Sequence, residues 1–218
     1  MKIELHSHTA HSSRCGKVDA EQSVRMHAQA GYGAMVITDH FNNENLEYFP
    51  GTSLEQVRAW LGGYEEARAA GERLGVRVLF GLEARLQDCD NDYLIFGVEP
   101  DFVLDNPRLN HLTLPELHRL CGQYGALLIQ AHPNRGACRP APAEDLDGVE
   151  VANGNPRHDS RNDVTLALAQ AHPKWIQTSG SDFHRPEDVD HGGILTDMDV
   201  RTSAELAQCL KSGNYTLL

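Results

Sequence analysis

Three histidines stand close together near the N-terminus, in the stretch LHSHTAHSS at residues 5–13. His6 and His8 follow a short apolar run that predicts a β-strand, and they are two residues apart. Because side chains alternate across a strand, both imidazoles would point to the same face. Neutral imidazoles are good ligands for zinc, manganese and iron, so the pair predicts a shared metal ion.

Further polar side chains that a core would not accommodate recur where later apolar runs end. They are Asp39, His40, Glu83, His132, Asn153, Asp182 and His184. Asp92 is an exception, because it stands before the fourth run and not after it. These candidates are too many for one tetrahedral ion. A site with two ions roughly 3.5–4 Å apart, joined by a bridging carboxylate, would account for their number.

The elements that position these residues alternate between two hydrophobic periods. Short apolar runs predict seven buried strands: KIELHSH, GAMVITDH, VRVLFGLEARL, DYLIFGV, ALLIQAHP, GVEVANG and WIQTSGSDFH. Capping signals and helical spacing predict helices over residues 19–31, 53–75, 113–125, 159–171 and 203–211. Repeated β-then-α units predict a mostly parallel sheet with helices outside.

The polar strand ends distinguish an open sheet from a barrel. With neighbouring strands about 4.8 Å apart, the outermost ends of an open seven-stranded sheet would lie ~29 Å apart and could not share one site. Barrels gather the carboxyl ends of their strands around one site. We therefore expect an α/β fold, a distorted seven-stranded (β/α)7 barrel of the TIM type, formed by a single domain over residues 1–218.

Composition limits the possible partners. Nineteen Lys and Arg against thirty-one Asp and Glu give a formal charge of −12, which argues against a nucleic-acid duplex as partner. We expect a cytoplasmic protein without membrane contact, because we find no leader pattern and no long apolar stretch. The five cysteines form no CxxC pair and are interpreted as ordinary thiols: Cys15, Cys89, Cys121, Cys138 and Cys209.

Two other kinds of catalytic site fit the sequence poorly. Several serines stand near histidines, but there is no GxSxG motif, and a serine triad would leave the other histidines and carboxylates unexplained. The phosphate-binding patterns GxxxxGK[ST] and GxGxxG are absent from the sequence. The residues therefore favour metal-dependent hydrolysis.

Six motifs together carry a family resemblance: LHSHTAHSS, VITDHF, FGLEARL, QAHPNRG, VEVANG and GSDFHRPEDV. In this order and at these distances they resemble the PHP (polymerase and histidinol phosphatase) superfamily over nearly the whole chain. The resemblance implies a distorted seven-stranded barrel, two or three divalent transition-metal ions (Zn, Mn or Fe) and phosphoester hydrolysis. No large polymerase segments are present, so we expect a stand-alone phosphoesterase.

The resemblance also implies a set of metal ligands. By position they are His6, His8, Glu83 and Asp182 for a first ion, His40 and His184 for a second that Glu83 bridges, and His132 for a third. Many members have Asp or His five or six residues after the HxH motif, where this chain has Ser13 and Arg14, so His11 is the nearest substitute. The family's histidine after the Glu is also missing, and Asp92 is the nearby candidate for the third ion.

The expected reaction is in-line attack on phosphorus by a hydroxide that bridges two ions, because metal binding lowers the pKa of water to about 7. Glu83 would hold the two ions together, and His158 would protonate the leaving group. The candidates for binding the phosphate are Arg135, Arg157 and Arg185. Asn153 and Asp39 would orient metal ligands.

Three hypotheses about function follow. The first is a phosphatase or phosphodiesterase that acts on a small phosphorylated metabolite or nucleotide. The second is a metal-dependent C–N hydrolase of the amidohydrolase kind, because the same fold and hydroxide serve carbonyl chemistry. The third is a catalytically silent metal-binding module. The arginines favour phosphate as the substrate group, and the nearly complete ligand set argues against the silent module.

Overall fold

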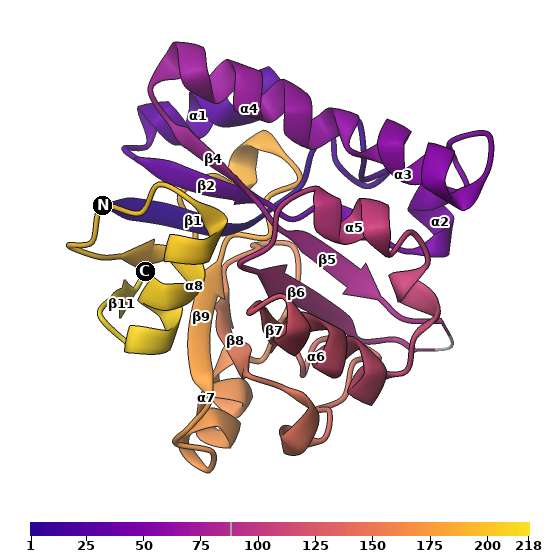
Figure 1. The fold of residues 1–218 in the computed structure, drawn as a ribbon. Coiled ribbons are helices and arrows are strands. Elements are labelled where there is room, and N and C mark those ends of the chain that lie inside the picture. Colours follow the sequence, from indigo (N-terminus) through magenta and orange to yellow (C-terminus); the bar gives the residue numbers. More distant parts are fainter. Residues whose placement is uncertain (88) are drawn as a thin grey trace.

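The structure, a computed structural model, describes residues 1–87 and 89–218 and has a mixed α/β fold (Figure 1). Its strands are β1 (Lys2–Ser7), β2 (Ala34–Ile37), β3 (His40–Phe41), β4 (Arg77–Phe80), β5 (Leu82–Arg85), β6 (Asp92–Phe96), β7 (Leu127–Gln130), β8 (Gly148–Asn153), β9 (Ile176–Gly180), β10 (Ile194–Leu195) and β11 (Thr216–Leu217). Its α-helices are α1 (Ala20–Gln29), α2 (Asn43–Leu46), α3 (Ser53–Trp60), α4 (Gly62–Leu74), α5 (Asp101–Asp105), α6 (Leu114–Gln123), α7 (Asn162–Gln170) and α8 (Ser203–Ser212).

The strands form two sheets, with the orders β11-β10-β1-β2-β4 and β3-β5-β6-β7-β8-β9. Neighbours run parallel except around β6, β10 and β11, and β6 is antiparallel to both β5 and β7. An isolated parallel bridge joins Ser7, at the end of β1, to Phe183 in the segment that follows β9. The α/β class is therefore confirmed, whereas the single closed seven-stranded barrel is not.

Two of the predicted strands are split, and the split separates the sheets. The run GAMVITDH gives β2 in one sheet, and β3 begins at its last residue in the other; VRVLFGLEARL gives β4 and β5 in the same way. The second break falls at Gly81, where a Cβ would lie 2.8 Å from Val36 Cγ1 and 3.0 Å from the Ile95 carbonyl oxygen. A close backbone approach at glycine commonly marks such a bend in a strand.

The predicted helix over residues 53–75 is two helices, α3 and α4, which meet at Leu61. Gly62 and Gly63 follow this junction, and a Cβ on Gly63 would collide with the hydroxyl groups of Thr9 and Ser12. The pair of glycines therefore lets α4 begin against the loop that follows β1. The other predicted helices are found with shifted ends, and α1 begins as expected, with Asp19 accepting the Gln22 N–H at 2.8 Å.

The strands are apolar on both faces. Met35 and Ile37 of β2 belong to the core beneath the outer helices. Ala34 and Val36, on the other face, pack in an inner cluster with residues of α8. Both sides of the sheets are covered, so polar side chains concentrate at the strand ends.

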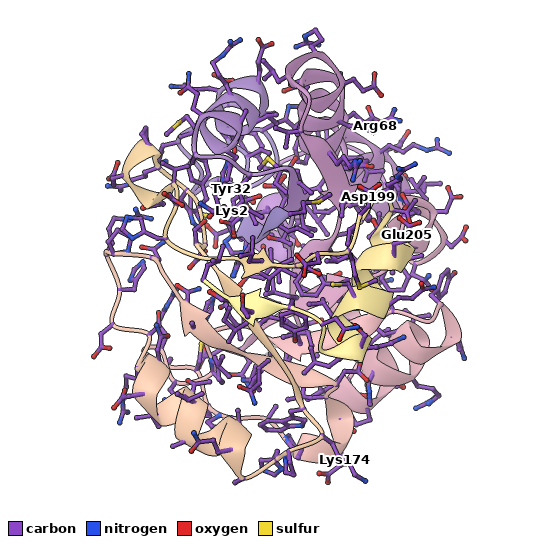
Figure 2. The ribbon with its side chains drawn as sticks, turned by 90° about the vertical axis from the view of Figure 1, so that its left-hand side faces the viewer. Lys2, Tyr32, Arg68, Lys174, Asp199 and Glu205 are labelled. Atoms are coloured by element: carbon purple, nitrogen blue, oxygen red, sulfur yellow. The ribbon has the colours of Figure 1, made fainter. Side chains whose placement is uncertain are left out.

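The start of β1 is tied to the chain that follows the ninth strand. Lys2 pairs with Asp190, and its Nζ lies 4.1 Å from the centre of the Tyr32 ring (Figure 2). These contacts fix the strand that carries the HSH motif. In the part of the chain that the structure describes, no helix is both long and apolar enough to cross a bilayer.

Candidate metal centre

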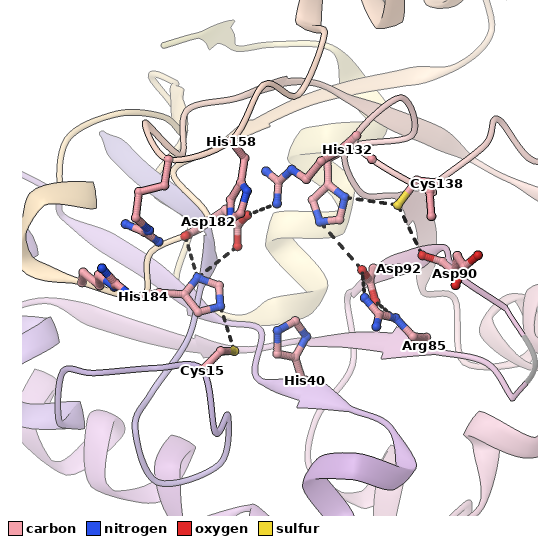
Figure 3. Close-up of a pocket in the computed structure, with 15 residues that line it drawn as sticks. Cys15, His40, Arg85, Asp90, Asp92, His132, Cys138, His158, Asp182 and His184 are labelled. Atoms are coloured by element: carbon pink, nitrogen blue, oxygen red, sulfur yellow. Dashed lines mark hydrogen bonds and ion pairs between the residues drawn. The ribbon is translucent and has the colours of Figure 1, made fainter.

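The expected ligands gather at the edge of the sheets where most strands end. Figure 3 shows four of them around a pocket: His40, His132, Asp182 and His184. His40 and Glu83 lie at or near the starts of β3 and β5, just after the ends of β2 and β4. The other ligands lie at or just after the ends of β1, β7 and β9: His6 and His8, His132, and Asp182 with His184. Asp92 reaches the same edge because β6 runs antiparallel, so that its first residue pairs with Arg85 at the end of β5. Residues far apart in the sequence thus form one cluster.

The first position lies between two imidazoles and two carboxylates. Glu83 Oε1 is 3.4 Å from His6 Nε2, and Glu83 Oε2 is 3.4 Å from His8 Nε2. Asp182 Oδ1 lies 3.5 Å from His6 Nε2 and 3.3 Å from His8 Nε2. Both Nε2 atoms and Glu83 Oε2 are buried and have no hydrogen-bond partner among the described residues. Buried polar atoms are rarely left unpaired, and a cation would satisfy all three.

Contacts at Nδ1, the ring nitrogen that faces away from the cluster, fix the orientation of the His6 and His8 imidazoles. His6 Nδ1 lies 2.9 Å from Glu150 Oε1, and His8 Nδ1 lies 3.3 Å from Ser13 Oγ. Ser13 Oγ in turn donates to Asp39 Oδ1 at 2.6 Å. With a proton on each Nδ1, the lone pair of each Nε2 points into the cluster, as metal ligation requires. Asp39 therefore orients His8 as predicted, but it acts through Ser13.

The charges of the cluster favour a bound cation. Burial alone would raise the pKa of Glu83, but the His6 and His40 rings hold it well below its usual range. The pKa of Asp182 is likewise held well below its usual range by His6 and His8, although burial alone would raise it. Burial alone would lower the pKa of His6, but Glu150 and the other two carboxylates keep it well above its usual range. The ionised carboxylates thus favour a proton on the His6 ring, and a metal ion would take the place of this proton.

A second position lies between His8, His40 and His184, whose ring nitrogens are within 4.8 Å of one another. His40 Nδ1 is 2.8 Å from Glu83 Oε2, so Glu83 faces both positions. Cys15 Sγ lies 3.1 Å from His184 Nε2 (Figure 3). Burial alone would raise the pKa of the Cys15 thiol, but hydrogen bonds with His184 and His40 lower it to about 6. The interpretation of Cys15 as an ordinary thiol therefore missed a residue of this site.

The third position is less well formed. His132 Nε2 is 3.2 Å from Glu83 Oε1 but 4.0 Å from Asp92 Oδ2. The Asp92 carboxylate is already held by Arg85, whose Nε and Nη2 donate to it at 2.8 and 2.6 Å. Cys138 Sγ lies 3.9 Å from His132 Nδ1. Asp92 would bind an ion here only in competition with Arg85.

Two of the candidate ligands have unusual backbone conformations. His132 has φ of 27° and Asp182 has φ of 51°, and both are non-glycine residues. Such strained conformations concentrate at functional sites, where the surrounding structure enforces them. Non-glycine residues rarely adopt a positive φ on their own, so contacts from the rest of the fold must hold these two side chains in place.

His11 does not join the cluster, and the expectation that it replaces the missing ligand is wrong in this structure. Its Nε2 lies 3.1 Å from the Ala59 carbonyl oxygen of α3, and its Nδ1 lies 3.5 Å from Glu66. Its ring stacks on Phe49, with 5.8 Å between the ring centres. The ring lies over Gly62, where the absence of a side chain leaves room for it.

Two of the three predicted phosphate-binding arginines are already engaged. Arg135 Nη1 donates to Asp182 Oδ2 at 2.7 Å, which leaves Oδ1 of that carboxylate facing the imidazoles. Arg157 pairs with the buried Asp188, whose Oδ2 accepts the His184 N–H at 2.8 Å. Both arginines therefore hold elements of the metal centre in place.

Arg185 and His158 lie at the mouth of the cluster. Arg185 is exposed, and no carboxylate of the described residues lies within ion-pair distance of its guanidinium. Both residues line a pocket of about 520 Å³ whose floor includes His40, His132 and Asp182. The pKa of His158 is lowered by partial burial and then by the charge of Arg135.

The fold and site define an α/β protein whose strand ends assemble imidazoles and carboxylates, a donor set that fits divalent transition-metal ions. A family model described as the PHP domain matches residues 4–177, and the chain belongs to this family. The predicted resemblance is therefore confirmed.

Curated relatives include PolC-type DNA polymerases III. The enzyme of Streptococcus mutans is 30% identical over 149 residues, which cover 61% of this chain, and that of Oceanobacillus iheyensis is 34% identical over 87 residues, which cover 40%. The matched regions are 9% and 5% of the length of these polymerases. The similarity therefore concerns a small part of each relative.

Two solved structures resemble the chain over nearly its whole length. One is a two-domain protein from Bacteroides vulgatus described as containing a predicted PHP-like metal-dependent phosphoesterase (TM-score 0.71, 17% identity, 100% of this chain and 64% of that chain). The other is an amidohydrolase from Chromobacterium violaceum (TM-score 0.59, 17% identity, 99% and 98%). At these identities the likeness establishes the fold alone.

Proposed function

We propose that this chain is a metal-dependent hydrolase that cleaves a phosphoester of a small metabolite or nucleotide. The observation that carries the proposal is the pocket of about 520 Å³ beside the ligand cluster, because its lining includes Arg185, whose guanidinium pairs with no carboxylate of the described residues. The other three arginines of the pocket are engaged by carboxylates: Arg85, Arg135 and Arg157. The volume of the pocket is within the range of small-molecule sites, roughly 300–1,000 Å³. Guanidinium groups suit the oxygens of a phosphate, and membership of the PHP family supports the same chemistry.

The metal ions would be two or three in number, of zinc, manganese or iron. Their ligands would be His6, His8, Glu83 and Asp182 for the first, His40 and His184 for the second, and His132 with Glu83 for the third. When bound, such ions lower the pKa of coordinated water to about 7 and offset charge on phosphate oxygens. Glu83 faces all three positions, so its carboxylate would be the group that bridges the ions.

The residues of the rim have separate roles in this proposal. Arg185 is free to bind a phosphate oxygen, while Arg135 holds Asp182 in position for its metal. His158 would donate a proton to the leaving oxygen. A phosphate dianion beside His158 would counter the positive charge of Arg135, which lowers the pKa of this histidine, and would thereby favour its protonated form.

The test begins with metal content. Protein purified without chelator is analysed for metals, reconstituted with zinc, manganese or iron, and offered phosphomonoesters, phosphodiesters, nucleotides and amides. We expect two to three ions per chain and turnover of phosphoesters that is lost in Asp182→Asn, which removes the charge of one ligand. Asp163→Asn, an exposed change in the first turn of α7, is the matched control.

The alternatives give different results in this test. Cleavage of amides without cleavage of phosphoesters would refute the proposal in favour of an amidohydrolase, the description of the Chromobacterium violaceum protein. Metal binding with no turnover of any substrate would indicate a silent module. One ion or fewer after reconstitution would refute the multi-metal centre itself.

A further inference from the structure

The second metal position lacks the ligand that was expected from the chain after the HxH motif. Ser13 Oγ donates to Asp39 and accepts the His40 N–H, so it is committed to orienting other groups. Arg14 is exposed and faces Glu44 at 3.6 Å. His11 lies against α3. None of these three side chains reaches His40 and His184 in a form that can bind a metal.

Cys15 occupies the place that these residues leave. Its Sγ is 3.1 Å from His184 Nε2, and the ring nitrogens of His8, His40 and His184, one from each, lie within 4.8 Å of one another. The third histidine of this group, His8, is fully buried, and its Nε2 has no hydrogen-bond partner among the described residues. A sulfur atom and imidazole nitrogens therefore converge from three separate parts of the chain.

The loop after β1 holds the thiol in this place. The Lys17 N–H donates to the His184 carbonyl oxygen at 2.8 Å, and the Gly16 N–H donates to the Ser13 carbonyl oxygen at 2.8 Å. A Cβ on Gly16 would lie 2.8 Å from the Thr9 carbonyl oxygen, so the turn closes tightly only with glycine. The loop is thus bonded directly to the segment that carries His184.

We propose that Cys15 is a thiolate ligand of the metal ion held by His40 and His184. The inference rests on the proposed metal centre and assigns a ligand that the family pattern of Asp or His at this point would not supply. The thiol proton would pass to water when the metal binds. Nitrogen and sulfur ligands of one tetrahedral zinc ion lie roughly 3.5 Å apart, close to the 3.1 Å between Cys15 Sγ and His184 Nε2.

A thiolate changes which metal the second position prefers. Sulfur ligands favour softer ions such as zinc, whereas carboxylate oxygen suits manganese and magnesium. The chain would therefore bind zinc at His40 and His184 in preference to manganese. Replacing the thiol with a carboxylate in Cys15→Asp should reduce the preference for zinc over manganese while keeping a charged ligand in the same place.

Cobalt(II) provides a test that does not depend on turnover. The metal-free full-length chain is titrated with Co²⁺, because a cobalt–thiolate bond gives an intense charge-transfer band in the near ultraviolet. We expect the band in the wild type and in Cys138→Ser, a matched control at the second cysteine of the same pocket. Cys15→Ser should lack the band, and Cys15→Asp should bind the same number of ions without it.

Three further measurements test the same assignment and check that the variants are folded. Alkylation of the wild type, mapped by mass spectrometry, should modify Cys15 in the metal-free protein and not after zinc is added. Zinc should bind the second position of Cys15→Ser at least about tenfold more weakly, since loss of even an outer partner of a ligand costs 10–100-fold. Circular dichroism should show that the variants are folded.

The outcomes separate this inference from the proposed function. Metal binding without the band, or a band that persists in Cys15→Ser, would overturn the role of Cys15 and leave the phosphoesterase proposal standing. A band lost only in Cys138→Ser would assign the thiolate to the third position and also overturn it. If the wild type bound no metal, both proposals would fail.

Discussion

Replacement of Glu83 by Gln tests the centre of the cluster, because this one carboxylate faces four imidazoles. Its Oε1 lies 3.4 Å from His6 Nε2 and 3.2 Å from His132 Nε2, and its Oε2 lies 3.4 Å from His8 Nε2 and 2.8 Å from His40 Nδ1. Glutamine has nearly the same volume as glutamate, so the buried site is filled but loses its negative charge. The change therefore isolates charge from packing.

The magnitude follows from the number of charged contacts that are lost. A hydrogen bond or contact to a charged group contributes about 1.5–3 kcal/mol, and Glu83 faces at least two ion positions, so about 3–6 kcal/mol of metal binding should disappear. This corresponds to roughly 10²- to 10⁴-fold weaker binding. Turnover should fall by more than ~10³-fold, because the ions would no longer be held together beside the substrate.

Metal content by elemental analysis and turnover at saturating metal are the two measurements. Glu66→Gln is the matched control, since Glu66 is an exposed residue of α4 whose partner His11 lies outside the cluster, and it should behave like the wild type. Wild-type metal content and turnover in Glu83→Gln would refute the reasoning. Glu83 would then be a structural residue near the metals and not their bridge.

Three further variants separate positioning from direct binding. Arg135→Ala should lower metal affinity by tenfold or more, because Asp182 loses a charge-assisted hydrogen bond of about 1.5–3 kcal/mol. Unchanged metal content would show that Arg135 binds the phosphate of the substrate instead. His11→Ala should leave metal content unchanged, and loss of an ion would restore His11 as a ligand. Arg185→Ala should raise KM for a phosphoester roughly tenfold and weaken inhibition by inorganic phosphate, with metal content unaltered; equal inhibition in wild type and variant would exclude Arg185 from the phosphate site.

The sequence was sufficient to predict most of the residues that form the cluster. It was not sufficient to predict that the strands divide into two sheets. The HSH motif, the TDH motif and the Glu83 and Asp182 positions could be placed at strand ends because alternation and apolar runs are local signals. The breaks at the end of β2 and at Gly81 depend on how two sheets meet. A run of apolar residues gives no indication of which sheet each half will join.

The orientation of the fourth strand was within reach of the sequence. A parallel neighbour requires a crossover of a dozen or more residues, whereas residues 86–91, six in number, separate β5 from β6. The polar residue Asp92 also stands before the strand and not after it. Both facts predict an antiparallel strand whose first residue lies at the same edge as the carboxyl ends of its neighbours, which is where the structure places Asp92.

The side-chain partnerships were beyond such arguments, and they change the assigned roles. An arginine near a predicted phosphate site looks the same in the sequence whether it binds substrate or holds Asp182, and only the 2.7 Å contact distinguishes the two for Arg135. Cys15 was likewise indistinguishable from the other thiols until the loop that closes at Gly16 brought it to His184. Local patterns specify which residue types are available at an edge, whereas long-range packing decides which of them share an ion. The experiments on Arg135 and Cys15 therefore test what the fold contributes to the centre beyond the motifs.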